Sequence, residues 1–597
     1  MKITRRGALE LGSGAAIVAA SGIGAAGAAG AAGAAGAAPV PAASPASRGT
    51  RAPRKPTAPS LPPAGADYVI IGAGSAGCVL ARRLTEAGAS VLLLEAGGDD
   101  ALPQIQEPRD WPGLQGSAVD WQYQTIPQPH TLGRTHAWAR GKVLGGSGSI
   151  NAMAHHRGHP SVYDAWERDF GAEGWSFREL LPYFSKLETF AGGASAYHGG
   201  DGPIFVDVPR GELQHPVARQ FIAASAATGY EPTDDLNGPR MEGPAWNPVA
   251  LQGRQRQGPA LCYLRPALAS KNPPTVVTAA RATRLTFEGT TCTGVAYRHG
   301  GQRRTALAAR EVLLCAGTIE SPKLLMLSGI GASAELAKPG IRVRAALPGV
   351  GKNLQDHLLG AGTVYESSRP LPLSNYQHGE AMQYLRTEAS LPGPNLLLMC
   401  VSVPFASPTL PPPPANAWTV LPCLMQPQSR GTVSLRSGEA VDAPVIDPNY
   451  FDDAVDVTTM MRGFDVARAI SSNAALDDWR AREILPGARW ATAVGRDEFV
   501  RQAANTFFHP VGTCALGNLP ESVVDPELRV QGLQGLRVVD ASVIPRIPSA
   551  PTHALVIAIA ERAADLIRGG KPLAAAPAEA TVAAAVARSD ADVTSRT

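Results

Sequence analysis

The pattern of apolar and polar positions predicts one βαβ unit where globular sequence begins. Residues 68–71 form a short apolar run, typical of a buried parallel strand, and residues 91–94 form a second one. Between the two runs lies an amphipathic stretch that ends near Glu86, and Gly88 stands where helix-ending glycines are common. Two buried strands joined by a helix predict a doubly wound sheet of the α/β class.

Further along the chain the pattern is mixed. Strands are predicted at 202–208, 275–287, 312–315 and 533–539, helices at 321–327 and 552–568, and a proline-rich loop at 404–414. A chain of 597 residues is too long for one simple domain, so two domains with large cores are expected.

Composition and charge narrow the class of protein. Hydrophobic residues make up 44% of the chain and charged residues 18%, which is ordinary for a globular protein. A formal net charge of +3 gives no reason to expect nucleic acid as a partner. None of the seven cysteines forms a C-x-x-C pair, and no apolar run is long enough to predict a membrane span.

The two ends of the chain have unusual composition. Arg5 and Arg6 precede a weakly apolar stretch, as in twin-arginine (Tat) export signals, so we expect a periplasmic or secreted protein. Residues 1–43 are interpreted as this signal with an Ala/Gly tract, and residues 44–65 as a Pro-rich linker. Residues 571–597 are predicted to be a flexible tail.

A glycine-rich turn follows the first predicted strand and opens the predicted helix. Gly72 suits a tight turn, Gly74 allows a pyrophosphate to approach the backbone, and Gly77 allows the helix to pack against the sheet. Ser75 and Ala76 would offer free N–H groups at the helix N-terminus. Glu95 ends the second strand, where it can accept hydrogen bonds from a ribose. This pattern predicts a dinucleotide site but leaves FAD and NAD both open.

Four further motifs stand in a fixed order along the chain. They are the segments 140–151 (RGKVLGGSGSIN), 317–331 (GTIESPKLLMLSGIG), 509–513 (HPVGT) and 540–545 (DASVIP), and Ala96-Gly97 directly after Glu95 adds to them. Together they resemble the glucose–methanol–choline (GMC) oxidoreductases over nearly all of residues 67–568. The resemblance implies an FAD-binding domain at 66–155, 260–345 and 510–570. It also implies a substrate domain at 156–259 and 346–509, built on an antiparallel sheet with helices.

The resemblance implies FAD as the cofactor and assigns residues to it. Besides the glycine turn, Glu95 and Ala96, these are Arg140, Val143, Gly146, Asn151, Ala152, Met153, Ala154, Ala282, Asp540 and Ala541. Ile150 falls where some members carry a histidine bonded covalently to the flavin. Isoleucine cannot form that bond, so noncovalent FAD is expected.

Two histidines match the family's catalytic positions. His509 corresponds to the general base and His553 to a second residue that hydrogen-bonds the substrate oxygen, and histidine suits proton transfer near neutrality. The implied reaction is oxidation of an alcohol, primary and in some cases aromatic, to its carbonyl, with oxygen or another acceptor taking the electrons. A hydroxynitrile lyase of the same family, a non-catalytic flavin-binding protein and an NAD-dependent dehydrogenase remain alternatives. His155, His156 and His159 lack the carboxylate or cysteine that would complete a metal site, so no metal is expected.

Overall fold

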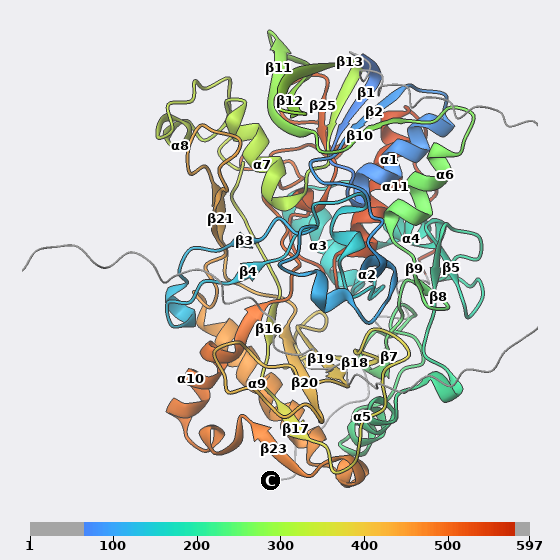
Figure 1. The fold of residues 1–597 in the computed structure, drawn as a ribbon, viewed down its shortest axis with the longest axis vertical. Helices are drawn as coiled ribbons and strands as arrows, with labels where there is room; N and C mark the ends of the chain where they lie inside the picture. Colours follow the sequence, from blue (N-terminus) through green and yellow to red (C-terminus); the bar gives the residue numbers. More distant parts are fainter. Residues whose placement is uncertain (1–64, 579–597) are drawn as a thin grey trace, which may run out of the picture.

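The structure, a computed structural model, describes residues 65–578 of the chain. Two large sheets organise it, one at the top and one at the bottom of Figure 1. This mixed α/β architecture confirms the predicted fold class. The predicted signal and all of the predicted linker except Gly65 lie outside the described residues, and so do residues 579–597 of the predicted tail.

The first sheet is mostly parallel. Five of its strands run parallel: β1 (Gly65–Ile71), β2 (Val91–Leu94), β10 (Thr275–Val277), β13 (Gln302–Leu314) and β25 (Leu536–Val538). An antiparallel extension, β12 (Thr291–His299) and β11 (Arg281–Glu288), continues from β13. Blue, green and red segments meet in this sheet, so it is assembled from parts of the chain that are far apart in sequence (Figure 1).

The register of the parallel strands brings their carboxyl ends to one edge. Ile71 pairs with both Leu94 and Leu314, and Leu314 pairs with Val538. The residues just beyond these four positions therefore lie close together. Ligands of open α/β sheets bind in the crevice outside such an edge, so this edge is the place to look for a cofactor site.

Helix α1 (Ser75–Glu86) connects β1 to β2 as the apolar pattern predicts. Its apolar side is buried, and it packs beside α11 (His553–Ile567), which is red in Figure 1 and lies next to the blue α1. An ion pair of 2.7 Å joins Arg83 of α1 to the buried Glu561 of α11. The C-terminal helix is thus held against the first helix of the domain.

The second sheet is antiparallel, with the order β18-β19-β20-β16-β24; β17 also pairs with β20, and β23 pairs with β17. Its strands are β16 (Leu358–Gly360), β17 (Val364–Glu366), β18 (Ala381–Leu385), β19 (Leu396–Val401), β20 (Ala417–Leu424), β23 (Arg482–Leu485) and β24 (Ala504–Thr506). Helices α5 (Pro216–Ala227), α9 (Ala454–Ser471) and α10 (Ala493–Ala503) pack around it at the bottom of Figure 1. All eight residues of β20 are buried, so this strand shows no alternation of polar and apolar positions.

Smaller elements connect the two sheets. The helices are α2 (Pro103–Gln106), α3 (Pro160–Phe170), α4 (Phe177–Lys186), α6 (Arg265–Leu268), α7 (Gly317–Leu327) and α8 (Ser333–Ala337). The short strands are β3 (Tyr123–Gln124), β4 (Ala137–Trp138), β5 (Glu188–Phe190), β6 (Ile204–Val206), β7 (Gly243–Trp246), β8 (Leu251–Gln252), β9 (Gln255–Arg256), β14 (Ile330–Gly331), β15 (Ala345–Ala346), β21 (Thr432–Ser434) and β22 (Val445–Asp447). Within residues 65–578, no helix combines the length and the apolar character that a bilayer crossing requires.

Two segments differ from the sequence prediction. The single strand expected at 275–287 is two strands, because Ala279 turns the chain with a φ of +50° and donates its N–H to Gly97. The tail predicted from 571 onward begins as a packed segment, because Leu573 donates its N–H to the hydroxyl of Tyr183 and Ala576 exchanges hydrogen bonds with Arg178 of α4. For residues 571–578, the prediction of a flexible tail therefore needs correction.

Candidate active site

The turn between β1 and α1 contains two glycines, Gly72 and Gly77, that a larger residue could not replace without movement of the backbone. A Cβ on Gly77 would lie 1.9 Å from the carbonyl oxygen of Gly72, so α1 begins in direct contact with the strand end. Gly72 has a φ of +100°, which favours glycine. No described side chain caps the first turn of α1, and that turn contains no acidic residue. Its N–H groups, with Ser75 and Ala76 first in the helix, remain available to an anion.

Glu95 follows β2 at the same edge of the sheet. Its carboxylate accepts the N–H of Ala73 at 2.9 Å and that of Gly97, beyond Ala96, at 2.7 Å. Burial raises the pKa of Glu95 to about 7, because removal from water penalises the charged form more than these hydrogen bonds favour it. The side chain thus bridges the glycine turn to the segment after β2.

Residues 140–154, called the flavin loop below, contain the 140–151 motif and the FAD-assigned residues up to Ala154, and they lie directly on the glycine turn. Gly145 donates its N–H to Ala73 at 2.8 Å, and a Cβ on Gly146 would lie 2.7 Å from the Cα of Gly74. Val143, within the loop, is fully buried. The structure therefore brings the flavin loop so close to the glycine turn that only glycine fits at position 146.

The end of the flavin loop is held by a buried arginine. The guanidinium of Arg256 donates to the backbone and side-chain oxygens of Asn151, both at 2.7 Å, while its Nη2 is buried without a partner in the described chain. Burial lowers the pKa of Arg256 to about 9. Met153, after Ala152, has a φ of +60°, and Ala154 pairs with Val249, so the chain turns sharply where the family resemblance places the flavin ring.

The last predicted cofactor residues lie at the same edge, but the side chain of Asp540 has other partners. Its carboxylate accepts the N–H of Gly317 at 2.8 Å, the hydroxyl of Ser321 at 2.6 Å and the N–H of Ser542 at 2.8 Å. Asp540 therefore fixes the start of α7, and Ala541 follows it half-buried at the edge. For a cofactor, this stretch offers its backbone.

Ala282 lies in β11, opposite Tyr297 of β12. Two residues before it, Ala280 donates its N–H to the carbonyl of Glu95 at 2.8 Å. The beginning of β11 therefore sits beside Glu95, at the edge where the other FAD-assigned residues lie.

His509 is held by a turn that leaves the second sheet after β24. Phe508 has a φ of +61°, and its carbonyl accepts a hydrogen bond from Arg140 of the flavin loop. The N–H of His509 donates to Asp356 at 2.8 Å, and its Nδ1 lies 3.0 Å from Nδ1 of His357. Burial, followed by the nearby His357, Arg140 and His156, keeps the pKa of His509 well below its usual value.

His553 opens α11 and lies close to the flavin loop. A Cβ on Gly148 would lie 2.8 Å from its Nε2. Both of its ring nitrogens are buried and have no hydrogen-bond partner in the described chain. Burial, with His155 and Arg256 nearby, lowers the pKa of His553 to about 3. Both predicted catalytic histidines thus lie at one loop, one contributed by each large sheet region.

Three residues at this site escaped the sequence analysis: Asp356, His357 and Arg256. Asp356 accepts hydrogen bonds from Thr506 at 2.6 Å, from Tyr450 and from the backbone of His509. The available signal was a polar Gln-Asp-His stretch just before an apolar strand, where buried polar groups need partners. Arg256 gave no comparable signal, because a lone arginine in a polar stretch usually faces solvent.

The three neighbouring histidines each have their own partners. His155 lies 3.2 Å from the buried Glu188, His156 hydrogen-bonds Asn247 at 2.7 Å, and His159 contacts Ser161 at 2.8 Å. No group of three or more possible metal ligands occurs among residues 65–578.

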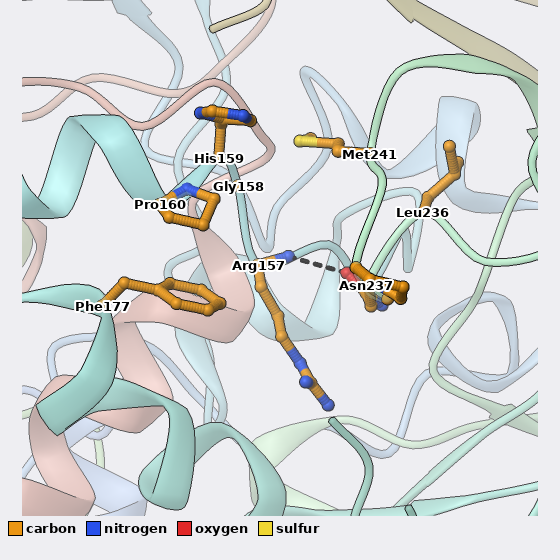
Figure 2. Close-up of a pocket in the computed structure, with 10 residues that line it drawn as sticks. Arg157, Gly158, His159, Pro160, Phe177, Leu236, Asn237 and Met241 are labelled. Atoms are coloured by element: carbon orange, nitrogen blue, oxygen red, sulfur yellow. Dashed lines mark hydrogen bonds between the residues drawn. The ribbon is translucent and has the colours of Figure 1, made fainter. Parts of the chain in front are cut away.

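A small cavity of about 10 Å³ lies next to this stretch, between Arg157, His159, Phe177 and Leu236 (Figure 2). Figure 2 shows the backbone N–H of Arg157 donating to Asn237, at 3.0 Å. This cavity has room for about one water molecule, and neither His509 nor His553 lines it.

Comparison with known proteins places these features in context. Residues 66–359 and 427–560 match the two models described as GMC oxidoreductase. The chain is 39% identical to pyridoxine 4-oxidase of Microbacterium luteolum over 83% of this chain and 98% of that protein. It is also 39% identical to the mitochondrial choline dehydrogenase of Homo sapiens over 84% and 89%.

Solved structures give the same picture. The crystal structure of pyridoxine 4-oxidase from Mesorbium loti superposes with a TM-score of 0.81 at 38% identity, covering 85% of this chain and 99% of that one. A fungal aryl-alcohol oxidase superposes with a TM-score of 0.74 at 25% identity, covering 85% and 99%.

Proposed function

Because the chain belongs to the GMC oxidoreductase family, whose members are FAD-dependent, we propose that it oxidises a primary alcohol to the aldehyde with His509 as the base. The observation that carries this proposal is that His509 and His553 each adjoin the flavin loop. Arg140 of the loop donates a hydrogen bond to the carbonyl of Phe508, the residue before His509. His553 lies close to Gly148 of the same loop. Two histidines kept neutral by burial at such a place suit proton transfer and alignment of an alcohol oxygen.

The residues at the sheet edge fit FAD. The uncapped first turn of α1 suits the pyrophosphate, and Gly74 and Gly146 bring the backbone of the turn and of the flavin loop together without a Cβ between them. Ile150 is buried and offers no nucleophile, which supports noncovalent binding. When bound, FAD supplies the acceptor for the hydride that leaves the alcohol carbon.

The protein's own residues would handle the proton. His509 takes the proton of the hydroxyl group as the C–H bond breaks, which lowers the barrier because an alkoxide releases hydride more readily than an alcohol. His553 is placed to hydrogen-bond the same oxygen with a ring nitrogen that has no protein partner in residues 65–578. Because burial depresses both pKa values, each ring is neutral at pH 7 before the alcohol arrives.

The surroundings of the two histidines favour a neutral alcohol with an apolar or aromatic body. Phe507 lies with its ring centroid 4.5 Å from that of His509 and packs in one apolar cluster with Ala154, Met399 and Phe405. The charged neighbours that act on the two histidine rings are all basic. The nearby Asp356 already accepts three hydrogen bonds. A quaternary ammonium substrate such as choline would find no free carboxylate in this part of the described chain.

Anaerobic mixing of the purified yellow protein with alcohols tests the proposal. We expect benzyl alcohol or pyridoxine to bleach the flavin, and choline to do so much more slowly. Acid precipitation should release intact FAD into the supernatant. Flavin that stays oxidised with every alcohol would refute alcohol oxidation and favour a lyase or a non-catalytic flavoprotein. Preferential reduction by choline would refute the assignment of a neutral substrate.

A further inference from the structure

His357 lies between two partners, one on each ring nitrogen. Its Nε2 is 2.9 Å from the carbonyl oxygen of Pro548, and its Nδ1 is 3.0 Å from Nδ1 of His509. A carbonyl can only accept, so Nε2 of His357 carries the proton of that hydrogen bond. In a neutral imidazole the other nitrogen is then an acceptor, so Nδ1 of His509 must be the donor.

His357 has the environment of a permanently neutral ring. It is fully buried, and burial lowers the pKa of His357 to about 3. The groups that face it are the backbone of Pro548 and Met425 and the ring of His509, so no carboxylate favours a charged state. The direction of the hydrogen bond to His509 is therefore fixed over the whole neutral pH range.

The backbone around both rings is rigidly connected. Leu358 of β16 pairs with Thr506 of β24, and Phe507 donates its N–H to the carbonyl of His357 at 2.9 Å. The neighbouring Asp356 binds the N–H of His509. Two consecutive residues thus bind His509: Asp356 binds its backbone N–H and His357 binds its ring.

We propose that His357 is a positioning residue that fixes His509 in the tautomer with the proton on Nδ1 and the lone pair on Nε2. This inference rests on the proposed role of His509 as the base. The only nitrogen of His509 that can then receive the hydroxyl proton is Nε2, which has no hydrogen-bond partner within residues 65–578. The proton moves from the alcohol oxygen to Nε2, and the Nδ1–H of the resulting imidazolium stays bonded to His357.

Two variants of similar shape separate the effect of losing the hydrogen-bond acceptor from the effect of changed packing. In His357→Asn, the side-chain oxygen can take the place of Nδ1 and still accept from His509. His357→Leu has a similar size but no acceptor, and both variants lose the contact with Pro548. We expect His357→Leu to lower the limiting rate of anaerobic flavin reduction by benzyl alcohol roughly 10- to 100-fold, the usual effect of losing an orienting partner, and His357→Asn to lose far less.

The pH profile gives an independent readout. An acceptor for the Nδ1–H stabilises the imidazolium of His509, so His357→Leu should move the acid limb of the pH–rate profile to lower pH, whereas His357→Asn should keep it near the wild-type position. Flavin content and thermal unfolding check that both proteins fold. Equal limiting rates of flavin reduction in the two variants, whether both are near the wild-type rate or both are low, would overturn the proposal, because the acceptor would then not matter. If wild type is reduced by none of benzyl alcohol, pyridoxine and choline, the proposed function itself fails; that result differs from equal variants of an active enzyme.

Discussion

The two predicted catalytic histidines differ in what holds them. His509 is fixed at its backbone by Asp356 and at Nδ1 by His357, whereas both ring nitrogens of His553 lack a partner in the described chain. A group held in one orientation suits a base, and a free ring can follow the substrate oxygen. This difference supports the roles that the family resemblance implies, with His509 as the base and His553 as the residue that hydrogen-bonds the substrate oxygen.

Substitution of the two histidines should therefore have unequal effects. We expect His509→Ala to keep FAD but to slow flavin reduction by about 10² to 10⁴, the usual contribution of a positioned base. His553→Asn should be milder because asparagine still donates a hydrogen bond, and His553→Ala should fall between. Anaerobic stopped-flow reduction is the measurement, with His130→Ala, a half-exposed residue, as the control. Fast reduction in His509→Ala beside slow reduction in His553→Ala would require the two roles to be exchanged.

Glu95 should make FAD affinity depend on pH. Burial raises the pKa of its carboxyl to about 7 in the cofactor-free protein, and ribose hydroxyls would bind the ionised form. FAD binding then releases a proton, so affinity should rise about tenfold from pH 6 to pH 8 and level off above. Glu95→Gln should bind FAD more weakly and with a flat profile, as measured by fluorescence titration of the apoprotein. Glu86→Gln, exposed at the end of α1, should keep the slope; a slope that survives in Glu95→Gln would assign it to another group.

At the level of elements, the sequence predicts what is local and periodic. β1, the glycine turn, α1 and β2 were recoverable because each follows from neighbouring residues. The second sheet was predicted only through the family resemblance, because strands such as β20 are buried on both faces and carry no alternation. His357 was missed because its contact with His509 exists only through the pairing of β16 with β24.

The start of α1 gives a test of how tightly the cofactor turn is packed. Gly77→Ala would place a methyl group 1.9 Å from the carbonyl of Gly72, so backbone must move. We expect a loss of about 1–3 kcal/mol in the free energy of unfolding, together with loss of bound flavin. Gly113→Ala is the matched control, because nothing lies within 4 Å of its added Cβ, and it should change stability by less than about 0.5 kcal/mol. Thermal unfolding and the flavin-to-protein absorbance ratio measure both effects; equal behaviour of the two variants would contradict the close contact.

At the scale of the whole molecule, the candidate cofactor site combines residues that lie far apart in the sequence. Its edge joins the glycine turn near residue 72 to Asp540 beyond β25, and β25 must pair with β13 to bring them together. A chain that is still unfolded therefore has no complete FAD site. The division into domains at the sequence-predicted boundaries stays a prediction, although both family matches span parts of each sheet.

Because only the folded chain has a complete FAD site, the export route should be one that carries folded proteins. We propose that Arg5 and Arg6 direct export by the twin-arginine route, which carries folded proteins, so that FAD is bound before translocation. The family match begins only at residue 66, after the predicted signal and linker. Replacing Arg5 and Arg6 with lysine should leave yellow, folded precursor in the cytoplasm, measured by fractionation, immunoblotting and flavin fluorescence. The matched control replaces Arg51 and Arg54 of the predicted linker with lysine, which should leave export intact. Equal amounts of exported protein from the two double variants would exclude this route, because lysine keeps the charge and removes only the arginine pair that the signal requires.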